Sequence, residues 1–219
     1  RDQPRSRGLG DVYKRQIEGS DKMQILKLLT RLRQLCLEPR LVYDNIDQPS
    51  SKLKACMELI KTMQENKQKV LLFSSFTSVL DLIAEECQKA GITYYMLTGS
   101  TNKEDRRELV SRFQKDDTTL FLISLKAGGT GLNLTSAEVV IHFDPWWNVS
   151  AQNQATDRAY RIGQKNNVQV FNLVMKDSVE EKIIELQKRK KELADMFVEN
   201  NSGGLSQMSK EDILSLFTM

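Results

Sequence analysis

Short, almost continuous apolar runs alternate with amphipathic stretches along most of the chain. The apolar runs have strand character, and they predict strands at 69–75, 93–97, 119–124, 138–143 and 168–175. Between and around them, apolar residues recur at helical spacing, which predicts helices at 25–36, 52–66, 78–90, 102–115, 149–161 and 178–198. This alternation predicts an α/β fold, a three-layer lobe in which helices cover both faces of a mostly parallel sheet, with helical additions at the N- and C-terminal ends.

The same pattern divides the chain into four parts. Residues 1–16 have no usable apolar period and hold five Lys/Arg and two Asp, so we expect a non-native or disordered leader there. Residues 17–50 are predicted to be a helical lead-in and linker, and residues 51–177 the α/β lobe. Residues 178–219 are predicted to form C-terminal helices joined by a flexible NNSGG segment.

Charge is balanced over the predicted fold. The chain has 32 Lys/Arg and 29 Asp/Glu, and the leader accounts for five and two of them, which leaves 27 of each sign for the rest. Bulk attraction therefore does not favour nucleic acid. Any contact with nucleic acid must come from local placement of charge.

The composition also argues against several other classes of protein. The longest apolar runs are far shorter than the roughly 20 residues of a membrane span, so a membrane protein is not expected. Cys36, Cys56 and Cys87 are widely spaced among apolar helical positions, which predicts free thiols and no metal site. His142, the only histidine, lies in an apolar run and is predicted to be a packed residue. We expect a cytoplasmic protein, at the nucleoid in a bacterium, or a nuclear one in a eukaryote.

Small hydroxyl residues and glycines follow three of the predicted strands. In parallel sheets, ligands gather at the carboxyl ends of the strands, where these residues lie. The first set is Ser74, Ser75 and Thr77, and the second is Gly99, Ser100 and Thr101. The third is Ser124, Gly128 and Gly129, together with Lys126. Each set alone is explained by ordinary helix capping, as in the capping box predicted for Thr101 with Glu104. Three sets at one sheet edge favour a track for phosphate groups.

The loop KAGGTG, residues 126–131, is glycine-rich, as phosphate-binding loops are. A P-loop requires a lysine and a Ser or Thr directly after its last glycine, but Leu132 and Asn133 follow Gly131 here. No other GK[ST] sequence occurs in the chain. The chain is therefore not a self-sufficient nucleoside triphosphatase of the P-loop type. A tight strand-to-helix connection is the alternative interpretation of the loop.

Gln154, Arg158 and Arg161 recur at a spacing that places them on one face of a helix. One interpretation is a solvated stripe in which Asp157 pairs with Arg161. The other is a pair of arginine fingers, because a planar and permanently charged guanidinium stabilises charge on a transferring phosphoryl group. Spacing alone leaves both interpretations open.

Four segments carry a resemblance to a known family: KVLLFSSFTSVLDLI, LTGST with Arg106 following, SLKAGGTGLNLTSAEVVIHFDPWWN and QATDRAYRIGQ. In this order and spacing they resemble the second RecA-like lobe of a SWI/SNF-type DNA-translocating ATPase of helicase superfamily two. The resemblance extends over residues 23–217. One departure is Val149, where the family usually has a proline after WWN, but a helix start favours proline without requiring it.

The resemblance implies a RecA-like fold and one half of a motor. It implies that ATP with Mg²⁺ is bound mainly by an N-terminal RecA-like lobe of the same protein. Arg158 and Arg161 are then the arginine fingers, and the positions near the nucleotide are Gly129, Gly131, Gln154 and Asp157. The implied contacts to the DNA are Ser74, Ser75, Gly99, Ser100, Arg106, Ser124, Lys126, Gly128 and Trp147.

The implied partner is double-stranded DNA, together with a DNA-bound protein that the motor remodels. Two alternatives stay open, the lobe of a strand-separating helicase and a non-catalytic nucleic-acid-binding module. The GGTGLNL and DPWWN segments favour the translocase over the unwinding helicase. A preceding lobe with a GK[ST] loop would favour either motor over the binding module.

Overall fold

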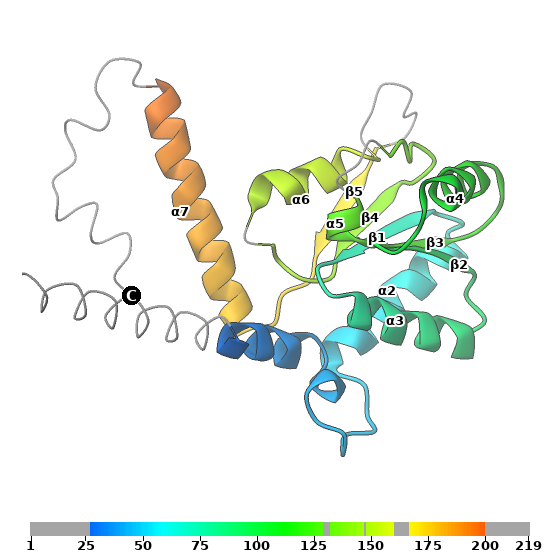
Figure 1. The fold of residues 1–219 in the computed structure, drawn as a ribbon, viewed down its shortest axis with the longest axis horizontal. Helices are drawn as coiled ribbons and strands as arrows, with labels where there is room; N and C mark the ends of the chain where they lie inside the picture. The colour runs from blue at the N-terminus through cyan, green and yellow to red at the C-terminus, as the bar shows by residue number, and fades with distance from the viewer. Residues whose placement is uncertain (1–26, 129–131, 147, 160–166, 200–219) are drawn as a thin grey trace, which may run out of the picture.

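The computed structural model describes residues 27–128, 132–146, 148–159 and 167–199 (Figure 1). Within these residues, five parallel strands form one sheet in the order β2-β3-β1-β4-β5. The strands are β1 (Val70–Ser74), β2 (Tyr94–Leu97), β3 (Leu120–Ser124), β4 (Val139–His142) and β5 (Gln169–Asn172). Each lies within an apolar run that predicts a strand, and their parallel pairing confirms the predicted α/β fold.

The central strand β1 shows why its sequence is apolar at successive positions. Val70 and Leu72 pack into one hydrophobic cluster, whereas Leu71 and Phe73 pack into another. Because side chains alternate between the faces of a strand, this places a cluster on each side of the sheet. All four residues are fully buried. A strand covered on both faces has no position where a polar side chain reaches water.

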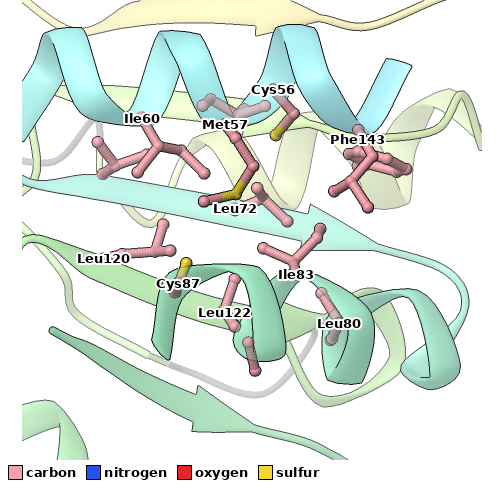
Figure 2. Close-up of a cluster of buried hydrophobic side chains, with 14 of the residues drawn as sticks. Cys56, Met57, Ile60, Leu72, Leu80, Ile83, Cys87, Leu120, Leu122 and Phe143 are labelled. Atoms are coloured by element: carbon pink, nitrogen blue, oxygen red, sulfur yellow. The ribbon is translucent and has the colours of Figure 1, made fainter. Parts of the chain in front are cut away.

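Helices cover both faces of the sheet (Figure 1). One face is covered by α2 (Ser51–Glu65) and α3 (Thr77–Lys89), and the other by α4 (Lys103–Lys115), the short α5 (Leu125–Gly128) and α6 (Val149–Thr156). Figure 2 shows Cys56 and Ile60 of α2, and Ile83 and Cys87 of α3, around Leu72 of β1. Their spacing is the helical period from which α2 and α3 were predicted.

Two further helical segments flank this lobe. Residues 27–37 are helical and lead into a short 3₁₀ helix, Pro39–Leu41, in agreement with the predicted helix end before Pro39. At the other end, α7 (Val179–Glu199) extends away from the sheet (Figure 1). Lys52 of α2 and Glu180 of α7 form a buried ion pair at 2.7 Å, which holds the start of α7 against the lobe.

The start of α4 differs from the sequence prediction. Its N-cap is Asn102, whose side-chain oxygen accepts from the backbone N–H groups of Glu104 and Asp105 at 3.0 and 2.8 Å. The predicted capping box of Thr101 with Glu104 is therefore wrong. The Thr101 hydroxyl instead accepts from the backbone N–H of Thr98 at 3.1 Å, inside the preceding turn.

Helix α6 is shorter than the predicted helix 149–161, because it ends at Thr156. The backbone N–H groups of Arg158 and Ala159 donate to the carbonyls three residues back, at 3.2 and 3.1 Å, which tightens the chain into a turn. The Arg158 carbonyl accepts from the backbone N–H of Leu134 at 3.0 Å. This long-range bond satisfies a carbonyl at the helix end, so the chain can leave the helical path there.

Cys36, Cys56 and Cys87 are free thiols, as predicted. Burial raises the pKa of the Cys87 thiol to about 12 and raises that of Cys56 as well, so both are protonated at neutral pH. In the described ranges, no His, Cys, Asp or Glu residues cluster in a way that could hold a metal ion. No helix in the same ranges is both long and apolar enough to cross a membrane.

Candidate functional site

The carboxyl edge of the sheet is organised around the Asp144 carboxylate, which follows β4. One of its oxygens accepts from the Ser74 hydroxyl at 2.7 Å and from the backbone N–H of Ser75 at 3.0 Å. The other accepts from the Ser75 hydroxyl and from the Arg33 guanidinium, the latter at 3.0 Å. The register of the sheet explains why Asp144 lies next to Ser74 and Ser75. Phe73 of β1 pairs with His142 of β4, so the loops after these two strands start side by side.

Arg33 and Asp144 were not among the sequence candidates. Both are buried, with side-chain exposures of 9% and 1%. Arg33 lies on a helix whose apolar pattern predicts packing but identifies no partner for the guanidinium. Asp144 stands directly after an apolar strand, in the DPWWN segment, and that position at the carboxyl end of a strand is the signal that could have found it.

The serines after β1 lie inside this network. Ser74 is fully buried, and the Ser75 hydroxyl both donates to Asp144 and accepts from Arg33 at 2.9 Å. Ser124, at the end of β3, pairs in register with Ser74 and is also buried. The predicted phosphate-contacting segments after β1 and β3 therefore share one edge of the sheet. Their contact with DNA stays a prediction.

The segment after β2 is open to solvent. Gly99 and Ser100 are exposed, and the Ser100 hydroxyl lies 2.8 Å from that of Thr98. A Cβ atom added at Gly99 would meet nothing within 4 Å, and its backbone is not in the left-handed region. Packing within the lobe therefore does not require glycine at this position, and its contact with DNA stays a prediction.

Basic residues gather next to the edge strand β2. The Arg106 guanidinium donates to the Ala127 carbonyl at 3.0 Å and so ties α4 to α5, while Lys126 is exposed. A cavity of about 670 Å³ lies beside them. It is lined by Thr101, Lys103, Arg106, Arg107, Val110, Ser111, Leu132 and Asn133. Of the predicted DNA contacts, Arg106 thus lines this cavity and Lys126 is exposed on the neighbouring α5, and the contact of both with DNA stays a prediction.

The structure separates two of the residues predicted to share a helix face. Gln154 is exposed on α6, whereas Arg158 lies beyond the end of α6 and is 5% exposed. Their placement on one continuous helical face is therefore wrong. Asp157 is exposed next to Arg158. Gly128 belongs to α5, and the predicted site residues Gly129, Gly131, Trp147 and Arg161 lie outside the described residues.

His142 is packed, as predicted. Its Nε2 lies 2.9 Å from the Thr156 hydroxyl, and its ring stacks on Phe73 with a centroid distance of 5.6 Å. Burial lowers the pKa of His142 to about 4, so the ring is neutral at physiological pH. His142 therefore anchors α6 to β4.

The loop after β4 is also held from α6 and α7. The backbone N–H of Trp146 donates to the Gln152 side chain of α6 at 3.3 Å, and Gln152 donates to Asn172 of β5 at 2.9 Å. The Trp146 carbonyl accepts from Gln187 of α7. The side chains of Gln152 and Gln187 thus hold Trp146 against α6, the helix that precedes Arg158.

A parallel α/β lobe with its polar loops gathered at the carboxyl edge of the sheet is the geometry of RecA-like motor lobes. Residues 51–163 match the helicase conserved C-terminal domain, and the chain belongs to that family. More narrowly, it is the C-terminal RecA-like lobe of a SWI/SNF-type ATPase of helicase superfamily two, as its relatives and solved neighbours indicate.

A Mycoplasma pneumoniae protein described as an uncharacterized ATP-dependent helicase is 38% identical over 217 residues, covering 99% of this chain and 21% of that protein. The putative ATP-dependent helicase/translocase YwqA of Bacillus subtilis is 37% identical, covering 90% of this chain and 22% of that protein. Among solved structures, the Sulfolobus solfataricus SWI2/SNF2 ATPase core in complex with dsDNA matches with a TM-score of 0.67 and 32% identity, over 89% of this chain and 42% of that one. The chain thus spans about a fifth of the length of these curated relatives.

Proposed function

We propose that the chain is the second motor lobe of an ATP-dependent double-stranded DNA translocase that remodels protein–DNA complexes. The observation that carries this proposal is the alignment of β1, β3 and β4, which brings the segments after these strands to one edge of the sheet. The solved SWI2/SNF2 core with dsDNA supports DNA as the partner. The site of action is then the bacterial nucleoid or the nucleus.

The fit of the chain to ATP is partial. It offers the turn after α6, with Asp157 and the buried Arg158, but no lysine follows the last glycine of the KAGGTG loop. If an N-terminal RecA-like lobe completes the site, that lobe supplies the lysine that this chain lacks. ATP with Mg²⁺, held mainly by that lobe, supplies the phosphoryl group whose transfer to water drives the motor.

In this proposal, the chain's own residues have two tasks. Arg158 and Arg161 stabilise the charge that develops on the transferred phosphoryl group, with Gly129, Gly131, Gln154 and Asp157 beside the nucleotide. The segments after β1, β2 and β3, together with Arg106 and Trp147, hold the DNA backbone. Because phosphate contacts carry no base information, binding is largely independent of sequence and weakens as salt increases. Closing and opening of the two lobes then moves the protein along the duplex.

The test is the ATPase rate of the longer protein that contains the first lobe, measured with duplex DNA, with single-stranded DNA and without DNA. We expect strong stimulation by duplex DNA. Stimulation by single strands alone favours a strand-separating helicase, and no hydrolysis under any condition favours a binding module. The 219-residue chain by itself is expected to show no turnover, since it lacks the P-loop lysine.

Replacing Arg161 with Ala in the longer protein tests the finger assignment. Loss of a finger is worth roughly 10³- to 10⁵-fold in rate, while DNA affinity should stay close to normal. Arg189→Ala on the exposed side of α7 is the matched control and should hydrolyse ATP at the normal rate. Normal hydrolysis by the Arg161→Ala protein contradicts the assignment.

A further inference from the structure

Both helices that flank the lobe reach the same short loop. We call residues 144–146 the junction loop. Arg33, from the helical residues 27–37, contacts it from one side, and Gln187 of α7 contacts it from another. Neither helix lies within the matched domain at 51–163, yet both are bonded to a loop that does.

The Arg33 guanidinium uses several of its binding modes at once. Its Nη2 donates to the Asp144 carboxylate at 3.0 Å, to the Ser75 hydroxyl at 2.9 Å and to the Pro145 carbonyl at 3.3 Å. Its planar group also lies 5.0 Å from the ring centroid of Phe76 and 5.7 Å from that of Trp146. A flat, delocalised cation can be hydrogen-bonded in its plane and stacked on its faces, whereas the compact ammonium of lysine cannot match this set.

Through Asp144, Arg33 reaches the loop after β1. The carboxylate that Arg33 holds also accepts from the Ser74 hydroxyl and from the backbone N–H of Ser75. These serines belong to the segment that the proposed function assigns to the DNA backbone. A side chain from outside the lobe is therefore hydrogen-bonded to this segment, both directly at Ser75 and through Asp144.

Through the junction loop, Arg33 also reaches the helix before the proposed arginine fingers. The Trp146 ring lies against Arg33, and the Trp146 backbone N–H donates to Gln152 of α6 at 3.3 Å. Gln152 is bonded in turn to Asn172 of β5. The segment proposed for DNA contact and the helix that precedes the proposed arginine fingers thus both contact the junction loop.

We propose that Arg33 is a positioning residue of the motor, whose guanidinium links docking of the lead-in helix to the orientation of the DNA-facing loop after β1 and of α6. The inference rests on the proposed function, because it needs a motor stimulated by DNA. A buried ion pair by itself would indicate only a fixed fold. What distinguishes Arg33 is that it bonds Ser75 of the proposed DNA-facing segment directly, and that its contact with Trp146 leads to Gln152 on the helix before Arg158.

The test compares Arg33→Lys and Arg33→Met in the longer protein that contains the first lobe. Arg31→Met is the matched control, since Arg31 is exposed on the same helix. For each protein we measure the thermal midpoint and the ratio of the ATPase rate with duplex DNA to the rate without it. Because DNA that binds the folded protein also stabilises it, the thermal midpoint is measured with and without DNA, and the rates are compared at a temperature where the protein is folded in both.

Arg33→Lys keeps a positive charge opposite Asp144, so its thermal midpoint should stay close to that of the unaltered protein. Its stimulation ratio should nevertheless fall about tenfold, because small errors in positioning are costly in rate. Arg33→Met should show an equal or larger fall, and Arg31→Met no change. If Arg33→Met does not fold, Arg33→Lys carries the comparison.

A normal stimulation ratio in Arg33→Lys overturns the inference. That result is distinct from failure of the proposed function, in which the unaltered protein itself is not stimulated by duplex DNA.

Discussion

Lys52–Glu180 and Arg33–Asp144 are both buried ion pairs that connect a flanking segment to the lobe, but their surroundings differ. The Lys52 amine bonds both Glu180 oxygens at 2.7 Å, and the same carboxylate accepts from the backbone N–H of Met175 at 2.8 Å. None of these groups belongs to the proposed site. The Asp144 carboxylate, in contrast, accepts from both serines at the end of β1.

The comparison shows that burial of an ion pair does not by itself indicate function. Burial lowers the pKa of the Lys52 amine, although the Glu180 carboxylate opposes this shift and Asp144 adds to the opposition. The pair therefore carries a desolvation cost that its hydrogen bonds offset, as buried pairs generally do. We assign Lys52–Glu180 to stability, because the Glu180 carboxylate bonds otherwise to the Met175 backbone, outside the proposed site. We assign Arg33–Asp144 to positioning, because the Asp144 carboxylate bonds to Ser74 and Ser75 of the proposed DNA-facing segment.

The largest expected effect on stability is that of Glu180→Ala. It leaves the Lys52 amine buried without its carboxylate and removes the acceptor of the Met175 N–H, so the free energy of unfolding should fall by about 3–5 kcal/mol. Denaturant titration measures this change. In the longer protein, the DNA stimulation ratio should stay normal in the fraction that is folded.

The double variant Lys52→Met/Glu180→Leu is the matched control, because apolar residues of similar volume often replace a buried pair without loss. It should recover most of the stability. A low stimulation ratio in this double variant would contradict the separation of the two pairs.

The next effect is a pH dependence that comes from His142, a buried ionisable group on β4 whose ring lies 2.9 Å from the Thr156 hydroxyl. Its pKa is about 4 in the folded chain and about 6.5 when unfolded, so below pH 6.5 the unfolded state takes up a proton that the folded state does not. The free energy of unfolding should fall by at most about 1.4 kcal/mol per pH unit as the pH drops from 6.5 to 5.

His142→Gln should flatten this slope, and denaturant titrations at several pH values provide the measurement. The test is specific because His142 is the only histidine of the chain, and Asp and Glu titrate mainly at lower pH. Equal slopes in the two proteins would show that another group is responsible.

The smallest effect is expected for an exposed pair on α7. Lys182 and Glu185 lie 3.1 Å apart with side-chain exposures of 69% and 53%. Solvent screens this pair, so Lys182→Ala should change the free energy of unfolding by less than about 0.5 kcal/mol. A loss comparable with that of Glu180→Ala would mean that charge, and not burial, sets the contribution of ion pairs on this helix.

The strands were predictable because the information for each is local. A run such as residues 120–123 is apolar at every position, and only a strand buried on both faces removes all of these side chains from water. The end of α6 was not predictable, because the N–H of Leu134 competes for the Arg158 carbonyl from a distant segment. The N-cap of α4 was predicted wrongly for a similar reason, because the Thr101 hydroxyl accepts from the backbone N–H of Thr98 and does not cap the helix.

For the candidate site, the sequence predicted which segments gather at the carboxyl edge of the sheet, but not the side chains that bond to one another there. Ser74 and Ser75 were predicted to contact the DNA backbone, and in the structure their hydroxyls donate to the Asp144 carboxylate. Arg33 and Asp144 are 111 residues apart, and no local pattern relates them. Arg106 was chosen from its place after LTGST, and its bond to the Ala127 carbonyl appears only when α4 and α5 pack together.

The sequence by itself determined the α/β class, the polar segments that follow the strands and the lack of a P-loop lysine, because apolar periodicity and residue order can be read within short stretches of the chain. Only the tertiary structure decided that Arg33 meets Asp144 and that Lys52 meets Glu180. Each ion pair joins residues far apart in the sequence, so its formation depends on the strand order, on the register and on the path of the connecting loops. Buried polar groups must find partners, and it is the packing of the whole lobe that selects which partners lie within reach.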